Sequence, residues 1–159
     1  MTKSNFERMI DLAQEAFDAH NDPEQLDVND EVIKKLQGLH PSTLSEYDDG
    51  NGPVVWILLI PTSSELMHQF IENRITETQL LDLTSPDEPF EAIYLCSAMV
   101  LPEFRGKGIA KKLALSAIEK IRETHPVKNL FVWAFSKEGL GLAKSIASST
   151  ALPLLSKQD

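Results

Sequence analysis

The chain has 159 residues, of which 42% are hydrophobic, and it carries a formal net charge of −9. This length and apolar content suit one domain with a closed core, and the longest unbroken apolar run, residues 54–60, is far shorter than the roughly 20 residues of a membrane-spanning helix. The amino terminus is polar, which argues against a signal peptide, and the single cysteine cannot form an internal disulfide, so we expect a cytoplasmic protein.

The charge is divided unevenly along the chain. Residues 1–90 hold 5 basic and 18 acidic side chains, whereas residues 91–159 hold 10 and 6. A basic carboxyl-terminal half suits an anionic cofactor, and an acidic amino-terminal half suits a cationic partner such as an amine, rather than a nucleic acid or a membrane. Acidic surface also serves solubility alone, and this alternative stays open.

Two helices are predicted in the amino-terminal part. Asn5 caps a helix over 6–20, and a second helix starts at 29–31 and ends near Gly38. The first helix has an apolar stripe that we expect to face a core, formed by Phe6, Met9, Ile10, Ala13, Ala16 and Phe17. Residues 42–53 are rich in turn-forming residues and are predicted to be a loop.

The middle of the chain alternates strands and helices. Residues 54–60 predict a strand that is buried on both faces and ends at Pro61, followed by a helix from 64 with a serine cap and a second helical segment over 77–83. The central strand is predicted over 90–101. Unless a bulge exchanges them, its side chains alternate between two faces, with Ala92, Tyr94, Cys96, Ala98 and Val100 on one and Ile93, Leu95, Ser97 and Met99 on the other.

The remaining elements form a strand-helix-strand unit and a tail. An amphipathic helix is predicted over 109–123, a buried strand over 130–135 and a further helix over 137–147. This order predicts parallel pairing of the two strands with a right-handed crossover. The tail, 151–155, is predicted to hold one short edge strand.

The turn between the central strand and helix 109–123 has the chemistry of a phosphate site. Gly106 and Gly108 remove β-carbons that would hold an anion away from the backbone, and the first N–H groups of a helix have no carbonyl partner within it. The glycines match neither the Walker pattern nor the full dinucleotide fingerprint, in which Lys111 takes the place of the third glycine.

The residues around the glycines sharpen this interpretation. The pattern Val100-x-Pro102-x-x-Arg105-Gly106-x-Gly108-Ile109-Ala110-x-x-Leu113 lies between a strand and a basic helix, and it resembles the acetyl-CoA signature of the GNAT N-acetyltransferase superfamily, Arg/Gln-x-x-Gly-x-Gly/Ala. The resemblance is densest over 93–115 and extends to about 147. It implies a single-domain α/β fold whose mixed sheet splays between the central strand and the strand near 130, flanked by helices. The helical insertion that this sequence predicts before the central strand is added to that fold.

The resemblance also implies how acetyl-CoA is held. Backbone groups of Ala98, Met99 and Val100 would bind the pantetheine arm and the acetyl carbonyl. The turn would bind the pyrophosphate through Arg105, Gly106, Lys107, Gly108, Ile109, Ala110 and Lys111. A neutral amine would attack the thioester directly, forming an oxyanion near the amide of Met99 or Val100, with no covalent enzyme intermediate and no metal. Lys107, Lys111 and Lys112 are either the wet face of a helix or contacts of the CoA 3′-phosphate.

The catalytic positions depart from the family. An asparagine often follows the second strand, with a tyrosine acid about seven residues on, but those positions are Ser136 and Ala143 here. Ser136 remains an expected cofactor contact. A glutamate that the family sometimes uses in the central strand is Tyr94 here, and Glu91 lies just upstream, so these two are the candidates for proton transfer. The alternatives are a packing tyrosine with a wet hydroxyl and a solvated strand end.

Other reactive residue types are assigned to structure. Cys96 is interpreted as a small core residue, both tryptophans as core anchors, and the four histidines lack the spacing of metal ligands. Acidic residues near the acceptor groove would attract an amine, namely Asp48, Asp49, Glu65 and Glu72.

The substrate side departs from the family as well. A hairpin commonly precedes the central strand in the family, whereas here a helical segment follows strand 54–60, and no final strand pair is predicted at the carboxyl end. The resemblance therefore does not imply a particular acceptor.

These observations predict one N-acetyltransferase-like domain over 1–159, with an acceptor-side half at 1–89 and an acetyl-CoA-binding core at 90–147. It would transfer an acetyl group from acetyl-CoA to a small-molecule or peptide amine, as a monomer or homodimer. Two alternatives stay open. One is a non-catalytic CoA-binding or regulatory module, favoured by the missing tyrosine, and the other is a nucleotide-binding protein with an unrelated phosphate turn.

Overall fold

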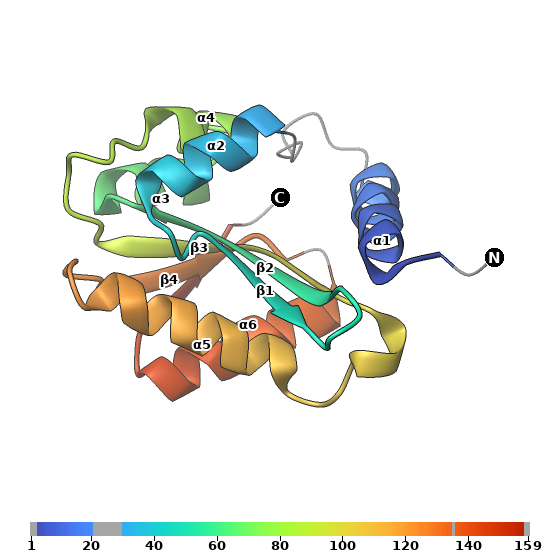
Figure 1. Ribbon diagram of the computed structural model, residues 1–159. Helices are drawn as coiled ribbons and strands as arrows, with labels where there is room; N and C mark the ends of the chain where they lie inside the picture. Colours follow the sequence, from blue (N-terminus) through green and yellow to red (C-terminus); the bar gives the residue numbers. More distant parts are fainter. Residues whose placement is uncertain (1–2, 21–29, 135, 158–159) are drawn as a thin grey trace.

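The fold is a five-stranded mixed sheet with helices on both faces (Figure 1). The computed structural model describes residues 3–20, 30–134 and 136–157, without the side chains of residues 16–20. In sheet order the strands are β1 (Leu44–Asp48), β2 (Pro53–Thr62), β3 (Ala92–Val100), β4 (Asn129–Val132) and β5 (Leu154–Ser156). Strands β1 and β2 pair antiparallel, as do β2 and β3, whereas β3 pairs parallel with β4 and β4 with β5. This is the mixed α/β architecture that the sequence predicts.

The helices form two layers. Between β2 and β3 lie α3 (Ser64–Ile71) and α4 (Glu77–Leu83), which cover one face of the sheet with α2 (Asp30–Leu39), while α5 (Ile109–Arg122) and α6 (Lys137–Thr150) cover the other face (Figure 1). The helix α1 (Asn5–His20) stands at the side, and a short 3-10 helix, η1 (Pro102–Phe104), follows β3. The helical insertion before the central strand is confirmed, with the predicted serine cap at Ser63 and a capping box at Thr76 and Gln79.

A separate core fills each side of the sheet. The core under α5 and α6 includes Val55, Ile57, Leu59 and Ile118, all almost fully buried. The core under α2, α3 and α4 includes Phe70, Tyr94, Phe131 and Trp133. The second core also holds buried polar side chains, among them Glu77.

The predicted loop at 42–53 contains an edge strand, so that prediction is wrong. Strand β1 pairs with β2 in an antiparallel hairpin, and its last three residues are exposed. A strand at an edge needs few apolar residues, and Leu44–Asp48 contains only Leu44 and Tyr47, which left no alternation to detect. The hairpin that the family places before the central strand is therefore present, and the helices are added after it.

The apolar stripe of α1 faces the core only in part. Met9 is fully buried, but Phe6 and Ile10 are 55% and 46% exposed. The ring of Phe6 packs edge-on against Trp56, and Arg8 forms a bidentate ion pair with Glu103 of η1. The side chains of Ala16 and Phe17 lie outside the described residues.

A bulge at Cys96 exchanges the two faces of β3. Opposite the neighbours Leu58 and Leu59 of β2 stand Ser97 and Leu95, so Cys96 is the extra residue. Before the bulge Tyr94 lies in the core under α2 to α4, but beyond it Val100 pairs with Val55 and packs on the opposite core. The prediction that Ala98 and Val100 share a face with Tyr94 is therefore wrong.

Pro61 does not end β2 as predicted, because the strand continues to Thr62. Strand β1 pairs with β2 only as far as Leu58, and the N–H of Leu59, two residues before Pro61, points toward that side. The nitrogen of Pro61 therefore faces an edge with no neighbouring strand in the described part of the chain, where a missing N–H removes no ladder bond.

The carboxyl-terminal elements follow the predictions with shifted ends. Strand β4 ends at Val132 rather than 135, α6 continues to Thr150, and the tail supplies β5 as a short edge strand. None of the helices in the described ranges is long and apolar enough to cross a membrane.

Candidate active site

The central strand has an open edge. Strands β3 and β4 pair only at residues 92–94 and 129–131, and from Leu95 to Val100 the same edge of β3 has no partner strand in the described chain. This is the predicted splay. Six unpaired residues span roughly 20 Å at ~3.3 Å each, and their N–H and C=O groups on this side can pair with an extended ligand.

The backbone N–H and C=O groups of successive residues in β3 point alternately toward β2 and toward the open edge. The N–H of Leu101 donates to the carbonyl of Val54 on β2 (3.0 Å). Alternate residues of an antiparallel strand point the same way, so Met99 also faces β2, whereas Ala98 and Val100 face the open edge. Of the three residues expected to bind the cofactor through their backbones, Ala98 and Val100 therefore face the open edge and Met99 faces β2, and the contacts themselves stay predictions.

The glycine turn joins this edge to α5. Gly106 and Gly108 have φ of +76° and +75°, which explains the glycines directly, because other residues are strained there. Nothing lies within 4 Å of a β-carbon built on either one, so the turn is open to a ligand. The side chain of Arg105 donates from Nε to the Val100 carbonyl (3.0 Å), across the end of the open edge.

The amino terminus of α5 is suited to an anion. No side chain caps it, and its first turn holds no acidic residue but does hold Lys111 and Lys112. Positive charge at a helix amino terminus opposes the helix dipole, and a bound phosphate relieves this repulsion while accepting the first N–H groups. Lys107 is exposed beside the turn, with its ammonium 5.5 Å from the centre of the Phe104 ring.

The predicted acid positions do not supply an acid. Ser136 is exposed and caps α6, since its Oγ accepts the N–H of Gly139 (3.0 Å). Ala143 is 3% exposed within the core. The side chain of Ser136 is thus engaged in a helix cap, and its expected contact with the cofactor stays a prediction.

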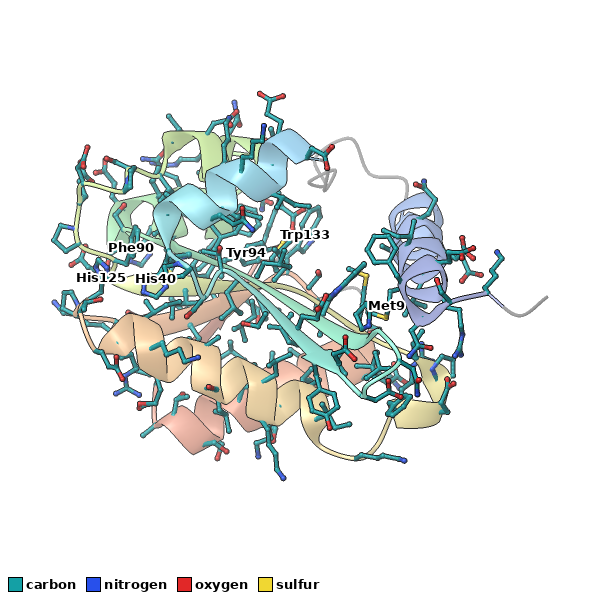
Figure 2. All side chains as sticks on the ribbon, in the orientation of Figure 1. Met9, His40, Phe90, Tyr94, His125 and Trp133 are labelled. Atoms are coloured by element: carbon teal, nitrogen blue, oxygen red, sulfur yellow. The ribbon has the colours of Figure 1, made fainter. Side chains whose placement is uncertain are left out.

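Tyr94 lies in a buried polar pair that the sequence did not reveal. The residue is 0% exposed, inside the core (Figure 2). Its hydroxyl donates to Oε2 of Glu77, which is itself 3% exposed at the start of α4. The alternative of a wet hydroxyl is therefore wrong. In the sequence Glu77 was one of several acids in a helical first turn, and only its place inside the fold separates it from them.

Cys96 extends this pair. Its thiol donates to the same Glu77 oxygen at 3.9 Å. Desolvation and the Glu77 carboxylate raise the pKa of the Cys96 thiol and of the Tyr94 hydroxyl well above their usual values, so both keep their protons near neutral pH. Nearby on the bulged strand, the buried Oγ of Ser97 has no hydrogen-bond partner within the described residues. We refer to Glu77, Tyr94, Cys96 and Ser97 as the polar cluster.

Glu91 has structural partners. One of its oxygens accepts the N–H of Ser64 at the start of α3 (3.3 Å), and the other lies 4.0 Å from the ammonium of Lys128. It precedes β3, three residues before Tyr94. The structure therefore gives Glu91 a bridging role between α3 and the sheet.

Two of the histidines meet in the structure. The rings of His40 and His125 lie 6.1 Å apart, and the Nδ1 atoms accept the N–H groups of Ser42 and Phe90 (Figure 2). Burial, with a contribution from His125, lowers the pKa of His40. The described residues contain no group of three His, Cys, Asp or Glu side chains that could hold a metal ion.

The four acids suggested for the acceptor groove are dispersed. Asp48 and Asp49 accept backbone N–H groups within the β1–β2 turn, and Glu72 pairs with Arg74 (3.2 Å). Glu65 is exposed on α3. The structure therefore does not gather them into one acidic site.

The sheet opens beside the bulged strand β3, which leads into the glycine turn and the basic start of α5. This arrangement is suited to an extended anionic ligand along β3. The sequence model of the acetyltransferase (GNAT) family matches residues 67–140, from α3 to the first turn of α6. The match covers a little under half of the chain and supports its membership of this superfamily, whose members use acetyl-CoA as co-substrate. No curated protein matched the sequence. The polar cluster and the glycine turn lie within the matched range.

Proposed function

We propose that this protein is an N-acetyltransferase that moves an acetyl group from acetyl-CoA to a primary amine by direct attack. The observation that carries this proposal is the continuous path from the open edge of β3 to the uncapped, basic start of α5. Its acceptor-side half would be residues 1–89 and its acetyl-CoA-binding core residues 90–147, in a cytoplasmic protein.

Acetyl-CoA would lie along this path as an added strand. Ala98 and Val100 offer backbone groups to the pantetheine arm, and Arg105 would exchange the Val100 carbonyl for a phosphate oxygen. The N–H groups of residues 106–111 would hold the pyrophosphate, with Lys107 and Lys111 adding charge. The amide of Val100, which faces the open edge, would stabilise the oxyanion.

The polar cluster would handle the amine proton. An ammonium must lose one proton before its nitrogen can attack the thioester carbon. The C–N bond forms first and gives the oxyanion, and the C–S bond breaks when this intermediate collapses. Because Tyr94 donates its own proton to Glu77, its oxygen is free to accept another, so Tyr94 and Glu77 can relay a proton from the amine. The second nitrogen proton would pass to the CoA thiolate. We favour this pair over Glu91, whose oxygens bridge Ser64 and Lys128.

Acetyl-CoA is expected to raise the melting temperature. At a concentration 100 times the Kd, linkage supplies about 2.7 kcal/mol, or a shift of roughly 5–10 °C for a domain of this size. Gly108→Glu should abolish the shift, because it strains a position at φ +75° and places a carboxylate at the anion site. Differential scanning fluorimetry with and without acetyl-CoA measures both effects.

Two control variants separate the causes. Gly108→Asn should keep most of the shift, since asparagine tolerates positive φ. Gly38→Glu puts the same charge on α2, where nothing lies within 4 Å, and should leave the shift intact. If millimolar acetyl-CoA gives no shift in the unaltered protein, the cofactor assignment is wrong.

A non-catalytic CoA-binding module is the second candidate, because neither Ser136 nor Ala143 supplies an acid. A thiol-release assay against polyamines, amino acids, aminoglycosides and peptides distinguishes the two. Release of CoA with one of these amines supports the transferase. If no amine in the panel causes CoA release while the thermal shift is still present, the regulatory module is favoured.

A further inference from the structure

A lysine ammonium lies inside the core beside the polar cluster. Lys157, just after β5, is 5% exposed, and its backbone N–H donates to the carbonyl of Val132 (2.9 Å). Its Nζ sits 3.9 Å from the centre of the Trp133 ring and 4.7 Å from that of Phe70. Lysine is rarely buried, because its charge is costly to remove from water. The two aromatic faces offset part of that cost.

The two rings lie beside the place where the sheet opens. Trp133 directly follows β4, beyond the last residue that pairs with β3, so it lies where the sheet has opened (Figure 2). Phe70 packs against Trp133 (6.2 Å between centres) and also against Tyr94 (4.8 Å). The rings therefore adjoin the polar cluster, on the face of the sheet opposite α5.

We propose that Trp133 and Phe70 form the binding site for the alkylammonium group of the acceptor, and that Lys157 holds this site when the acceptor is absent. The acceptor class is then a primary amine on a flexible, unbranched alkyl chain, which is the shape of the Lys157 side chain. The tail acts as a built-in competitor. This inference rests on the proposed function for its role in acetyl transfer, but the binding site itself can be tested without acetyl-CoA.

The first test uses the unaltered protein and n-butylammonium as the probe. A lysine-acetylating reagent, such as an N-hydroxysuccinimide acetate, is applied with increasing probe, and peptide mass spectrometry gives the labelling of Lys157 relative to Lys128. Lys128 is 68% exposed and corrects for reagent that the probe consumes. The ratio should start low and rise about tenfold as the probe displaces Lys157. Neutral 1-butanol should leave it unchanged.

The second test empties the site. In a Trp56→Phe background Trp133 is the sole tryptophan, so its fluorescence reports on the site. Lys157→Ala should bind n-butylammonium with saturable quenching, whereas Lys157→Met, which fills the same space with an apolar chain, should not. Adding Trp133→Leu to Lys157→Ala, with binding followed by calorimetry, should weaken the affinity about tenfold.

Two outcomes overturn the proposal. One is a labelling ratio that n-butylammonium does not change in the unaltered protein, which would make Lys157 a fixed anchor of the tail. The other is a folded Lys157→Ala variant that binds n-butylammonium no better than Lys157→Met. If Lys157→Ala does not fold, the labelling test decides alone. A missing acetyl-CoA shift refutes the proposed function and leaves these results standing.

Discussion

Replacing Phe70 with alanine is expected to lower the free energy of unfolding by about 3–5 kcal/mol. Phe70 is 0% exposed, and its ring touches those of Tyr94, Phe131 and Trp133. Removing it leaves a cavity at the centre of the core under α2 to α4 and takes one aromatic face from the Lys157 ammonium. Urea denaturation followed by circular dichroism gives the change in unfolding free energy.

Two variants calibrate this loss. Phe70→Leu keeps most of the volume and should be markedly less destabilising than Phe70→Ala. Leu83→Ala removes a large apolar side chain that is 55% exposed on α4, and should change stability by less than about 0.5 kcal/mol. A Phe70→Ala loss below about 1 kcal/mol would show that the aromatic rings repack around the gap and that Phe70 is not the centre of this core.

The sequence predicted the elements whose chemistry is local. A run of β-branched and aromatic residues predicts strand β2. A serine whose side chain accepts an N–H of the first turn predicts the start of α3. The glycine turn was predicted for a related reason. Gly106 and Gly108 have positive φ, a backbone conformation that favours glycine, so the residue type alone indicates it.

What the sequence missed depends on contacts between distant segments. Strand β1 is polar because it lies at the edge, and only its pairing with β2 makes it a strand. The bulge at Cys96 is a matter of register between β2 and β3, which no property of the cysteine signals. Glu77 resembles any acid at a helix start until α4 packs on the sheet and places it against Tyr94.

The same bulge connects the two halves of the proposed site. By exchanging the faces of β3, it leaves Tyr94 on the side of α2 to α4 and turns Val100 toward the core under α5 and α6. Beyond it, the backbone of Ala98 and Val100 faces the open edge. One strand can therefore serve a proton-accepting group on one face and a ligand along its edge, within seven residues from Tyr94 to Val100.

Replacing Glu77 with glutamine is expected to lower kcat by a factor of about 10²–10⁴ with an acceptor found in the thiol-release panel. Glutamine keeps an oxygen that accepts the Tyr94 hydroxyl proton, so the fold and the acetyl-CoA thermal shift should persist. It removes the negative charge that makes the proton relay possible. The low-pH limb of the kcat/KM profile, which reports the base of the free enzyme, should disappear in this variant.

Comparison with other variants shows whether the pair acts as a unit. Tyr94→Phe should cause a similar loss, and the double variant should be little worse than either single one, because both interrupt the same relay. Glu88→Gln, in the exposed loop before β3, is the matched control and should leave kcat unchanged. If Glu91→Gln abolishes turnover while Glu77→Gln does not, the base is Glu91, and the buried pair of Glu77 and Tyr94 is structural.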